Sequence, residues 1–420
     1  MRKVGVGDVE AKALGKILQS NHTLTHLCLA VNEITPVGVE ALADALRSNK
    51  ILEDLNIEDN VIDDEGAEAL GKVLQSNQTL TNLCLADNKI SPIGVKALAE
   101  ALKSNKILES LDIGNNDIGD EGAEALGKVL QSNHTLTHLY VAYNQITHIG
   151  VKTLAEALGS NKILENLNIG NNYIGDEGAE AISQVLESNR TLRELNVDIR
   201  AQAFCPPHRQ IGDQGVRDIA HALQYNSSLT RLSICGHSFS NSSFAALGKA
   251  LQSNCSLTHL YLRGFGTGLT GHHLVDGLSF ETFSKALQSR GTQMTHLDLG
   301  NLSISSSRVK PLAQALSVNG TLKRLDLNNN EIDCPGAVTL AQALKTNQSL
   351  IRLQLRNNKI GDAGAKEFVE VLQCNKTLMF LGLMNNRMTK SGEDLFKVLA
   401  GRLKLSESSV FSCGVEWIRN

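Results

Sequence analysis

The chain has 420 residues, of which 42% are hydrophobic, and its 40 Lys and Arg residues are slightly outnumbered by 44 Asp and Glu, giving a net charge of −4. This composition excludes a disordered chain and a small disulfide-stapled domain, and it leaves enough apolar material for a sizeable core. Without a net positive charge, the chain has no evident source of the phosphate-driven affinity that nucleic-acid binders use.

The N-terminal segment, residues 1–16, has no apolar run of signal-peptide length, since Asp8 and Glu10 interrupt it. Residues 6–10 align with Ile118–Gly122, which lie in the middle of a sequence repeat described below. We therefore expect either that residues 1–16 cap the exposed core at this end or that the chain is a piece of a longer protein. No run of about 18 or more uncharged apolar residues follows, and the eight Cys form no C-x-x-C pair. We therefore expect a cytoplasmic protein with reduced thiols and no membrane span.

From Leu24 onward the sequence repeats the pattern L-x-x-L-x-L-x-x-N-x-I, as in Leu80–Ile90. The interval is 28 residues everywhere except for two intervals of 37. Thirteen units begin at Leu24, Leu52, Leu80, Leu108, Leu136, Leu164, Leu192, Leu229, Leu257, Met294, Leu322, Leu350 and Leu378.

Each unit is predicted to contain one short strand and one helix. The alternation of Leu83 and Leu85 places them on one side of a strand, and the amide of Asn88 is expected to donate to and accept from buried backbone groups. Residues 64–75 are rich in helix formers with helical apolar spacing. Because strands lie about 4.8 Å apart and packed helices about 8 to 10 Å, the stack must bend.

A period of 20 to 29 residues with this pattern is typical of leucine-rich repeats. DEGAEA recurs at Asp64, Asp120 and Asp176, and with IGDEGAEALGKVLQSN-x-TLTHL the chain resembles the ribonuclease-inhibitor-like leucine-rich repeats, particularly the repeat regions of NOD-like receptors. The resemblance runs from Val6 to about Leu403. The predicted fold class is α/β: a leucine-rich repeat solenoid (horseshoe) of about 13 repeats of 28 residues, with the parallel sheet on its concave face and helices on its convex face. It occupies residues 1–404, with a cap or tail at 405–420 that carries Trp417.

Several motifs suggest chemistry but are better explained by the repeat. Gly66–Val73 matches most of a phosphate-binding loop, yet Val73 replaces the magnesium-binding Ser or Thr and the motif lies within a predicted helix. Cys205, His208, Cys235 and His237 lack the paired spacing of structural zinc sites. No catalytic constellation stands out. We predict no enzyme activity, no cofactor and no metal.

The displayed positions between and after the strand leucines differ in charge along the chain. They carry no Lys or Arg in units one to seven, whereas arginines predominate from unit eight onward. Segregated charge can orient a partner, although solubility alone is the simpler explanation. The predicted partner-binding residues are Asp54, Glu58, Asp59, Asp87, Asp112, Glu194 and Asp198; Arg231, Arg263, Arg324, Arg352 and Arg356; and the aromatic anchors Tyr140, Tyr143, Tyr261 and Phe265, with Phe380 as a further candidate.

The repeat is irregular in units seven to ten, where the asparagine position holds Arg200, His237, Phe265 and Leu302 and the asparagine ladder is expected to be lost. Longer loops fall near residues 201–210 and 266–273. Inserted loops in such arrays are frequently binding elements, and drift in a tolerant scaffold is the alternative.

These features together predict a non-enzymatic module that binds a protein partner through its concave face, and no nucleic acid, membrane or nucleotide. The resemblance to NOD-like receptors implies a sensing or autoinhibitory role in innate immunity. The alternative is regulation of an enzyme, as by ribonuclease inhibitors or GTPase-activating proteins with similar repeats, and a purely structural fragment is the third reading.

Overall fold

The computed structural model describes residues 5–199, 210–237, 239–264, 276–289, 291–402 and 416–418. The chain divides into two compact units, one ending at Asp198 and the other beginning at Ile199. Each is described below by itself. The predicted longer loops fall almost entirely on residues 200–209 and 265–275, outside the described residues.

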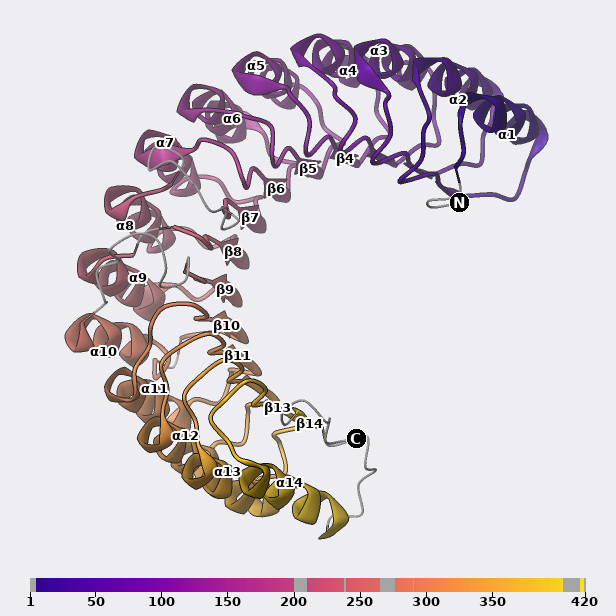
Figure 1. The fold of residues 1–420 in the computed structure, drawn as a ribbon. Helices are drawn as coiled ribbons and strands as arrows, with labels where there is room; N and C mark the ends of the chain where they lie inside the picture. Colours follow the sequence, from indigo (N-terminus) through magenta and orange to yellow (C-terminus); the bar gives the residue numbers. More distant parts are fainter. Residues whose placement is uncertain are drawn as a thin grey trace. The chain divides into compact units, whose positions relative to one another are not determined.

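The first unit alternates helices with three-residue strands (Figure 1). Its strands lie on the inner side of its curve and its helices on the outer side (Figure 1). The elements are α1 (Asp8–Ser20), β1 (His26–Cys28), α2 (Pro36–Ser48), β2 (Asp54–Asn56), α3 (Asp63–Leu74), β3 (Asn82–Cys84), α4 (Pro92–Ser104), β4 (Ser110–Asp112), α5 (Gly119–Leu130), β5 (His138–Tyr140), α6 (His148–Ser160), β6 (Asn166–Asn168), α7 (Gly175–Leu186) and β7 (Glu194–Asn196).

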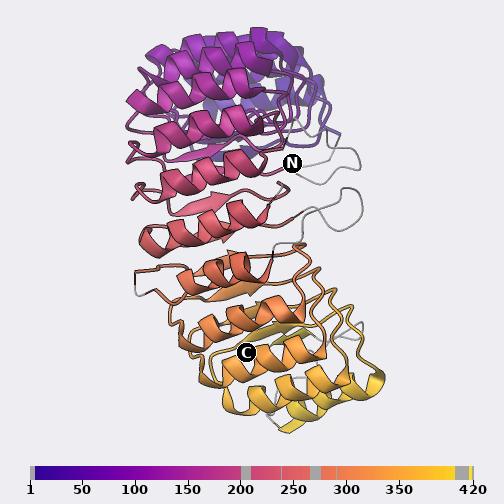
Figure 2. The ribbon, with the colours of Figure 1, turned by 90° about the vertical axis from the view of Figure 1, so that its left-hand side faces the viewer.

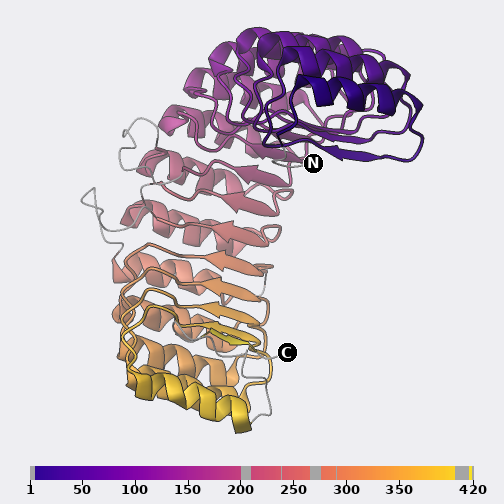
Figure 3. The same ribbon diagram turned by 45° about the vertical axis from the view of Figure 1, so that its right-hand side comes forward.

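The second unit repeats this arrangement, with its helices in one layer (Figure 2) and its strands side by side in another (Figure 3). Its elements are α8 (Asp213–Leu223), β8 (Arg231–Ser233), α9 (Asn241–Ser253), β9 (His259–Tyr261), α10 (Gly277–Ala286), β10 (His296–Asp298), α11 (Ser306–Val318), β11 (Arg324–Asp326), α12 (Cys334–Thr346), β12 (Arg352–Gln354), α13 (Asp362–Cys374), β13 (Phe380–Gly382), α14 (Lys390–Arg402) and β14 (Glu416–Ile418).

Neighbouring strands pair in chain order and in register, as the period requires. Leu55 pairs with Leu83, and Leu83 with Leu111, in parallel. In the second unit β8 to β13 are also parallel, whereas β14 runs antiparallel to β13 and pairs Leu381 with Trp417. The predicted parallel sheet with helices on one face is therefore confirmed within each unit.

The alternation of side chains on the strands is also confirmed. Leu83 and Leu85 are 2% and 0% exposed, whereas Asn82, Cys84 and Ala86 are partly exposed. Helix α3 closely matches the predicted helix 64–75, so the phosphate-loop-like Gly66–Val73 lies inside a helix.

The structural asparagines form hydrogen bonds with buried backbone groups as predicted, with an exception at Asn88. Asn116 Nδ2 donates to the backbone carbonyls of Leu85, Ile113 and Gly114, and its Oδ1 accepts from the backbone N–H groups of Asn88 and Ile90. The Oδ1 of Asn88 is buried and, within the described residues, has no hydrogen-bond partner.

The expected loss of the ladder in units seven to ten is wrong at His237. This imidazole is 2% exposed, and its Nδ1 accepts from the backbone N–H of Ile211 at 3.0 Å. The bond spans 26 residues, as does the bond from Ile34 N–H to Asn60 Oδ1. His237 therefore replaces asparagine as an acceptor, because Nδ1 lies at the same distance along the side chain as an asparagine Oδ1.

Aspartates of one 28-residue repeat cap the helix of the next repeat, which the sequence pattern alone did not reveal. Asp64 accepts from the backbone N–H and hydroxyl of Ser91, at 2.8 and 2.6 Å, and from Gly94 N–H at 2.9 Å. A Cβ at Gly94 would lie 2.7 Å from that carboxylate, so glycine is required there. At Asp8 burial alone would raise the pKa, but equivalent hydrogen bonds from Thr35 and Gly38 hold it below its ordinary value.

The turn after most strands contains a left-handed residue. Asn115 and Asn171 occupy it with φ of 51° and 56°, but Val31 and Tyr143 also adopt φ of 61° and 57°. Asparagine tolerates this conformation, whereas a β-branched side chain is strained in it.

Truncation of a core leucine should lower the stability of the protein, because each strand leucine fills space between adjacent repeats. Leu111 is 1% exposed, and Leu111→Ala should lower the free energy of unfolding by about 2 to 5 kcal/mol in reversible chemical denaturation. Ser110→Ala on the displayed side of the same strand is the control and should change stability little. A loss below about 0.5 kcal/mol for Leu111→Ala would contradict its inward assignment.

Exchange of residues at the left-handed turn should act in opposite directions. Val31→Asn should stabilise the protein by about 1 kcal/mol through relief of strain, and Asn115→Val should destabilise it by about 1 to 2 kcal/mol. Both variants are measured by urea unfolding. Changes of the same sign would show that side-chain contacts, rather than the backbone, decide this position.

Candidate protein-binding site

The first and third residues of each strand, together with those just after it, point away from the leucine core. In the first unit this displayed surface contains Asp54, Glu58, Asp112, Glu194 and Asp198, all partly exposed, which we name the acidic face. Asp59 and Asp87 lie fully exposed on the left-handed turn beside it, and Tyr143 is partly exposed in the same kind of turn.

The electrostatics of the acidic face are visible in its titratable groups. Burial raises the pKa of Asp112, and the charge of Glu58 raises it further, while the hydrogen bond from Gly114 N–H opposes both. Cys84 pairs across the sheet with Asp112. Burial and the charges of Asp112, Glu58 and Asp54 raise its thiol pKa to about 12. Cys84 is therefore a protonated, weakly nucleophilic thiol at neutral pH.

Tyr140, one strand further along, belongs to the same environment. Burial raises the pKa of its hydroxyl, and the charges of Glu194 and Asp112 contribute. A partner group placed here meets negative potential and one aromatic ring.

In the second unit the first strand positions form a different row, which we name the arginine row. It contains Arg231, His259, His296, Arg324 and Arg352, one from each of five neighbouring strands. The rings of His259 and His296 stack, with centroids 4.0 Å apart and planes inclined by 13°.

The stacked imidazoles lie in a positive environment. Burial lowers the pKa of His296 to about 4, together with the neighbouring His259 and the charges of Arg324 and Arg231. The pKa of His259 is lowered by burial and the same two arginines. Both rings are therefore neutral at pH 7, and the cationic charge of the row comes from its arginines.

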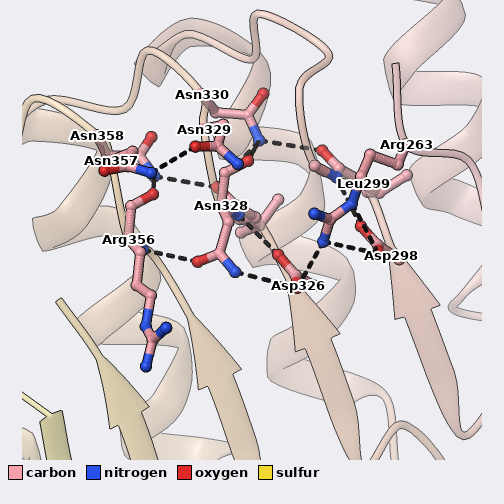
Figure 4. A network of polar contacts seen from close by, with 12 residues as sticks. Arg263, Asp298, Leu299, Asp326, Asn328, Asn329, Asn330, Arg356, Asn357 and Asn358 are labelled. Carbon is pink, nitrogen blue, oxygen red and sulfur yellow. Dashed lines mark hydrogen bonds and ion pairs between the residues drawn. The ribbon is translucent and has the colours of Figure 1, made fainter. Parts of the chain in front are cut away.

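The charge of Arg263 is compensated within the second unit. Its guanidinium contacts Asp298 at 3.0 Å and Asp326 at 3.1 Å and so bridges β10 and β11 (Figure 4). The Asp298 and Asp326 side chains are only 15% and 19% exposed. Arg263 thus offsets one of the two negative charges of these acids and holds both carboxylates in place.

At the end of the row, Arg352 covers an aromatic ring. Its guanidinium carbon lies 3.7 Å from the ring centroid of Phe380, a cation–π contact. Phe380, predicted to be an exposed anchor, is only 9% exposed and supports Arg352 from below.

A pocket of about 200 Å³ opens between the arginine row and the acids that follow it. Its polar lining is Tyr261, His296, Asp298, Arg324, Asp326, Arg352 and Gln354. Arg356 lies two residues after the end of β12, and its backbone N–H donates to Asn328 Oδ1 at 2.7 Å (Figure 4).

The structure brings most of the predicted residues onto these two faces. Phe265, Cys205 and His208 lie outside the described residues. The stacked histidines were not predicted as site residues, although the Thr-His dipeptide at the same strand position in β9 and β10 was a signal that could have found them. Across the described ranges, no three His, Cys, Asp or Glu side chains gather closely enough to hold a metal ion.

Every helix in the described part of the chain is too short or too polar to span a bilayer.

Comparisons with known proteins agree with the repeat architecture. The Leucine Rich repeat family model matches residues 20–43, 48–71, 76–99, 318–341 and 346–369. The TMOD/LMOD Leucine-rich domain model matches residues 88–204. No curated protein matches the chain significantly.

A solved structure shares the fold. An internalin from Listeria monocytogenes has a TM-score of 0.50 and 20% identity, over 95% of this chain and 93% of the internalin chain. The actin-binding site 2 of leiomodin-1 covers 43% of this chain and 87% of its own at 19% identity, with a TM-score of 0.30 that is too low to bear on the fold.

The positive potential of the arginine row can be measured through His296. Its imidazole should titrate near pH 4 by NMR, and Arg324→Gln should raise that midpoint because a nearby cation no longer opposes protonation. Lys345→Gln on α12 is the control and should leave it unchanged. A midpoint near the ordinary value of 6.5 in the native protein would contradict the described environment.

Proposed function

Because the chain is built of leucine-rich repeats, we propose that it is a non-enzymatic module that binds protein partners through the displayed side chains of its sheets. The observation that carries this proposal is the contrast between the two sides of each strand. The inward position is leucine in every strand from β1 to β13, whereas the outward positions vary between carboxylates, imidazoles, guanidiniums and aromatic rings. A constant core under a varied surface is suited to recognition.

The charge of each face indicates what it recognises. The acidic face of the first unit favours basic partner groups, and the arginine row of the second favours acidic ones. The charges on both faces are at least partly exposed to solvent. Salt should therefore screen them and weaken association, with a screening length of about 8 Å at physiological ionic strength.

Two features support binding over catalysis. The Cys84 thiol, which lies beside Asp112 of the acidic face, has its pKa raised to about 12 and is poorly activated. The carboxylates of Asp298 and Asp326 are occupied by Arg263.

The more specific proposals rest on the sequence resemblance. A cytoplasmic sensing or autoinhibitory role in innate immunity follows from the likeness to NOD-like receptor repeats, and the thiols of Cys84, Cys255, Cys334 and Cys374 are in keeping with a reducing compartment. Regulation of an enzyme is the alternative, and the acidic face would suit a basic enzyme.

The proposal is tested by charge reversal in pairs matched within each unit. Asp54→Lys on the acidic face is compared with Asp44→Lys on α2, and Arg324→Glu on the arginine row with Lys345→Glu on α12. Partners are captured from native cell extract, identified by mass spectrometry and titrated. The variants on the strand faces should weaken binding tenfold or more, about 1.4 kcal/mol, and the helix variants less than twofold. Equal losses for strand and helix variants would refute recognition through the sheet.

A further inference from the structure

We propose that the pocket in the second unit binds a carboxylate side chain from an acidic segment of the partner, with Arg352 and Arg324 as its receptors. The inference rests on the proposed function and adds the chemistry that one part of the face recognises. Burial, donor geometry, charge and size support it in turn.

Arg352 is held in place with unused hydrogen-bonding capacity. The cation–π contact with Phe380 fixes its guanidinium, yet its Nε is buried and, among the described residues, has no hydrogen-bond partner. A buried donor without an acceptor is unfavourable, so an incoming acceptor gains more here than on an open surface. The contact also reduces the side-chain entropy that binding would otherwise cost.

Arg324 supplies the second guanidinium. Its side chain is exposed, it pairs in register with Arg352 of the adjacent strand, and within the described residues it forms no ion pair. Two neighbouring guanidiniums repel each other, and burial together with Arg324 and Arg356 lowers the pKa of Arg352. An anion between them would relieve this repulsion.

The charge of the pocket fits a monoanion. Among the lining residues, the two positive charges of Arg324 and Arg352 balance the two negative charges of Asp298 and Asp326. Arg263, which is paired with both aspartates, adds one positive charge and leaves +1, because His259 and His296 are neutral. A carboxylate neutralises this charge, whereas a phosphate dianion would overcompensate it next to two aspartates. Guanidiniums also bind the planar carboxylate through paired hydrogen bonds.

The size of the pocket fits one side chain. Its volume of about 200 Å³ is below the roughly 300 to 1,000 Å³ of small-molecule sites, so an anchoring residue fits better than a metabolite. Tyr261 and Gln354 also line the pocket and provide neutral polar groups.

The test uses a fluorescent decameric poly-glutamate peptide on the full chain at low salt, with a poly-glutamine peptide as the matched probe. Fluorescence anisotropy should show binding of the glutamate peptide only. Arg324→Gln and Arg352→Gln should each weaken it at least tenfold, and Arg352→Lys should weaken it less because it retains the charge. Lys345→Gln on α12 should change it less than twofold.

Three results would overturn the inference: equal binding of both peptides, undiminished binding to Arg324→Gln, or stronger displacement by inorganic phosphate or a phosphoserine peptide than by a glutamate peptide. Because Arg324 is exposed, its replacement should not impair folding even if that of Arg352 does. A second readout is the His296 NMR midpoint, which a bound carboxylate should raise against the opposing effects of His259, Arg231 and Arg324. Loss of peptide binding with retained partner capture would refute this inference alone, whereas failed capture with intact peptide binding would refute the proposed function alone.

Discussion

The constraint on which the rest of the structure depends is the alternation of side chains along strands of only three residues. One leucine per strand faces the helices, so the two residues on either side must face outward. Because neighbouring leucines pair in register, as Leu83 does with Leu111, the outward residues also align into rows across the sheet. The acidic face and the arginine row are consequences of this register: a one-residue slip in any strand would exchange its buried and displayed sets.

The same register determines which charges on the two faces meet. Some groups compensate one another, as Arg263 does with Asp298 and Asp326, and others are set apart by neutral rings, as His259 and His296 separate Arg231 from Arg324. Arg324 and Arg352 remain adjacent like charges. Compensated groups organise the surface. Arg324, which is exposed and forms no ion pair among the described residues, is available to a partner.

The period made most of the fold predictable from the sequence. Leu83, Leu85 and Asn116 follow from a pattern that recurs in every regular unit, and local spacing places them in a strand, a core and a turn. Side-chain contacts between repeats were harder to predict from the sequence. Arg263 finds partners 35 and 63 residues away, and Asp64 caps a helix 27 residues further on; both depend on strand register and helix placement in three dimensions. The role of His237 was missed because a pattern compares residue types, whereas the backbone of Ile211 requires only an acceptor atom at the right place.

The strained turns show how far such a scaffold allows its displayed residues to vary. Tyr143 and Val31 adopt a left-handed conformation that asparagine adopts in other repeats. Backbone hydrogen bonds to the next repeat hold the turn, such as the bond from Tyr143 N–H to the carbonyl of Gly170 at 3.0 Å. The conformation is thus imposed by neighbouring repeats rather than by the residue itself. A position whose backbone is fixed from outside can exchange asparagine for an aromatic ring at a cost of about 1 to 2 kcal/mol, and a domain stabilised by many repeated contacts tolerates that cost. This is how a repeated sequence can present an unrepeated surface: the core and the ladders fix the backbone, and the exposed turns and strand faces are left to vary with the partner.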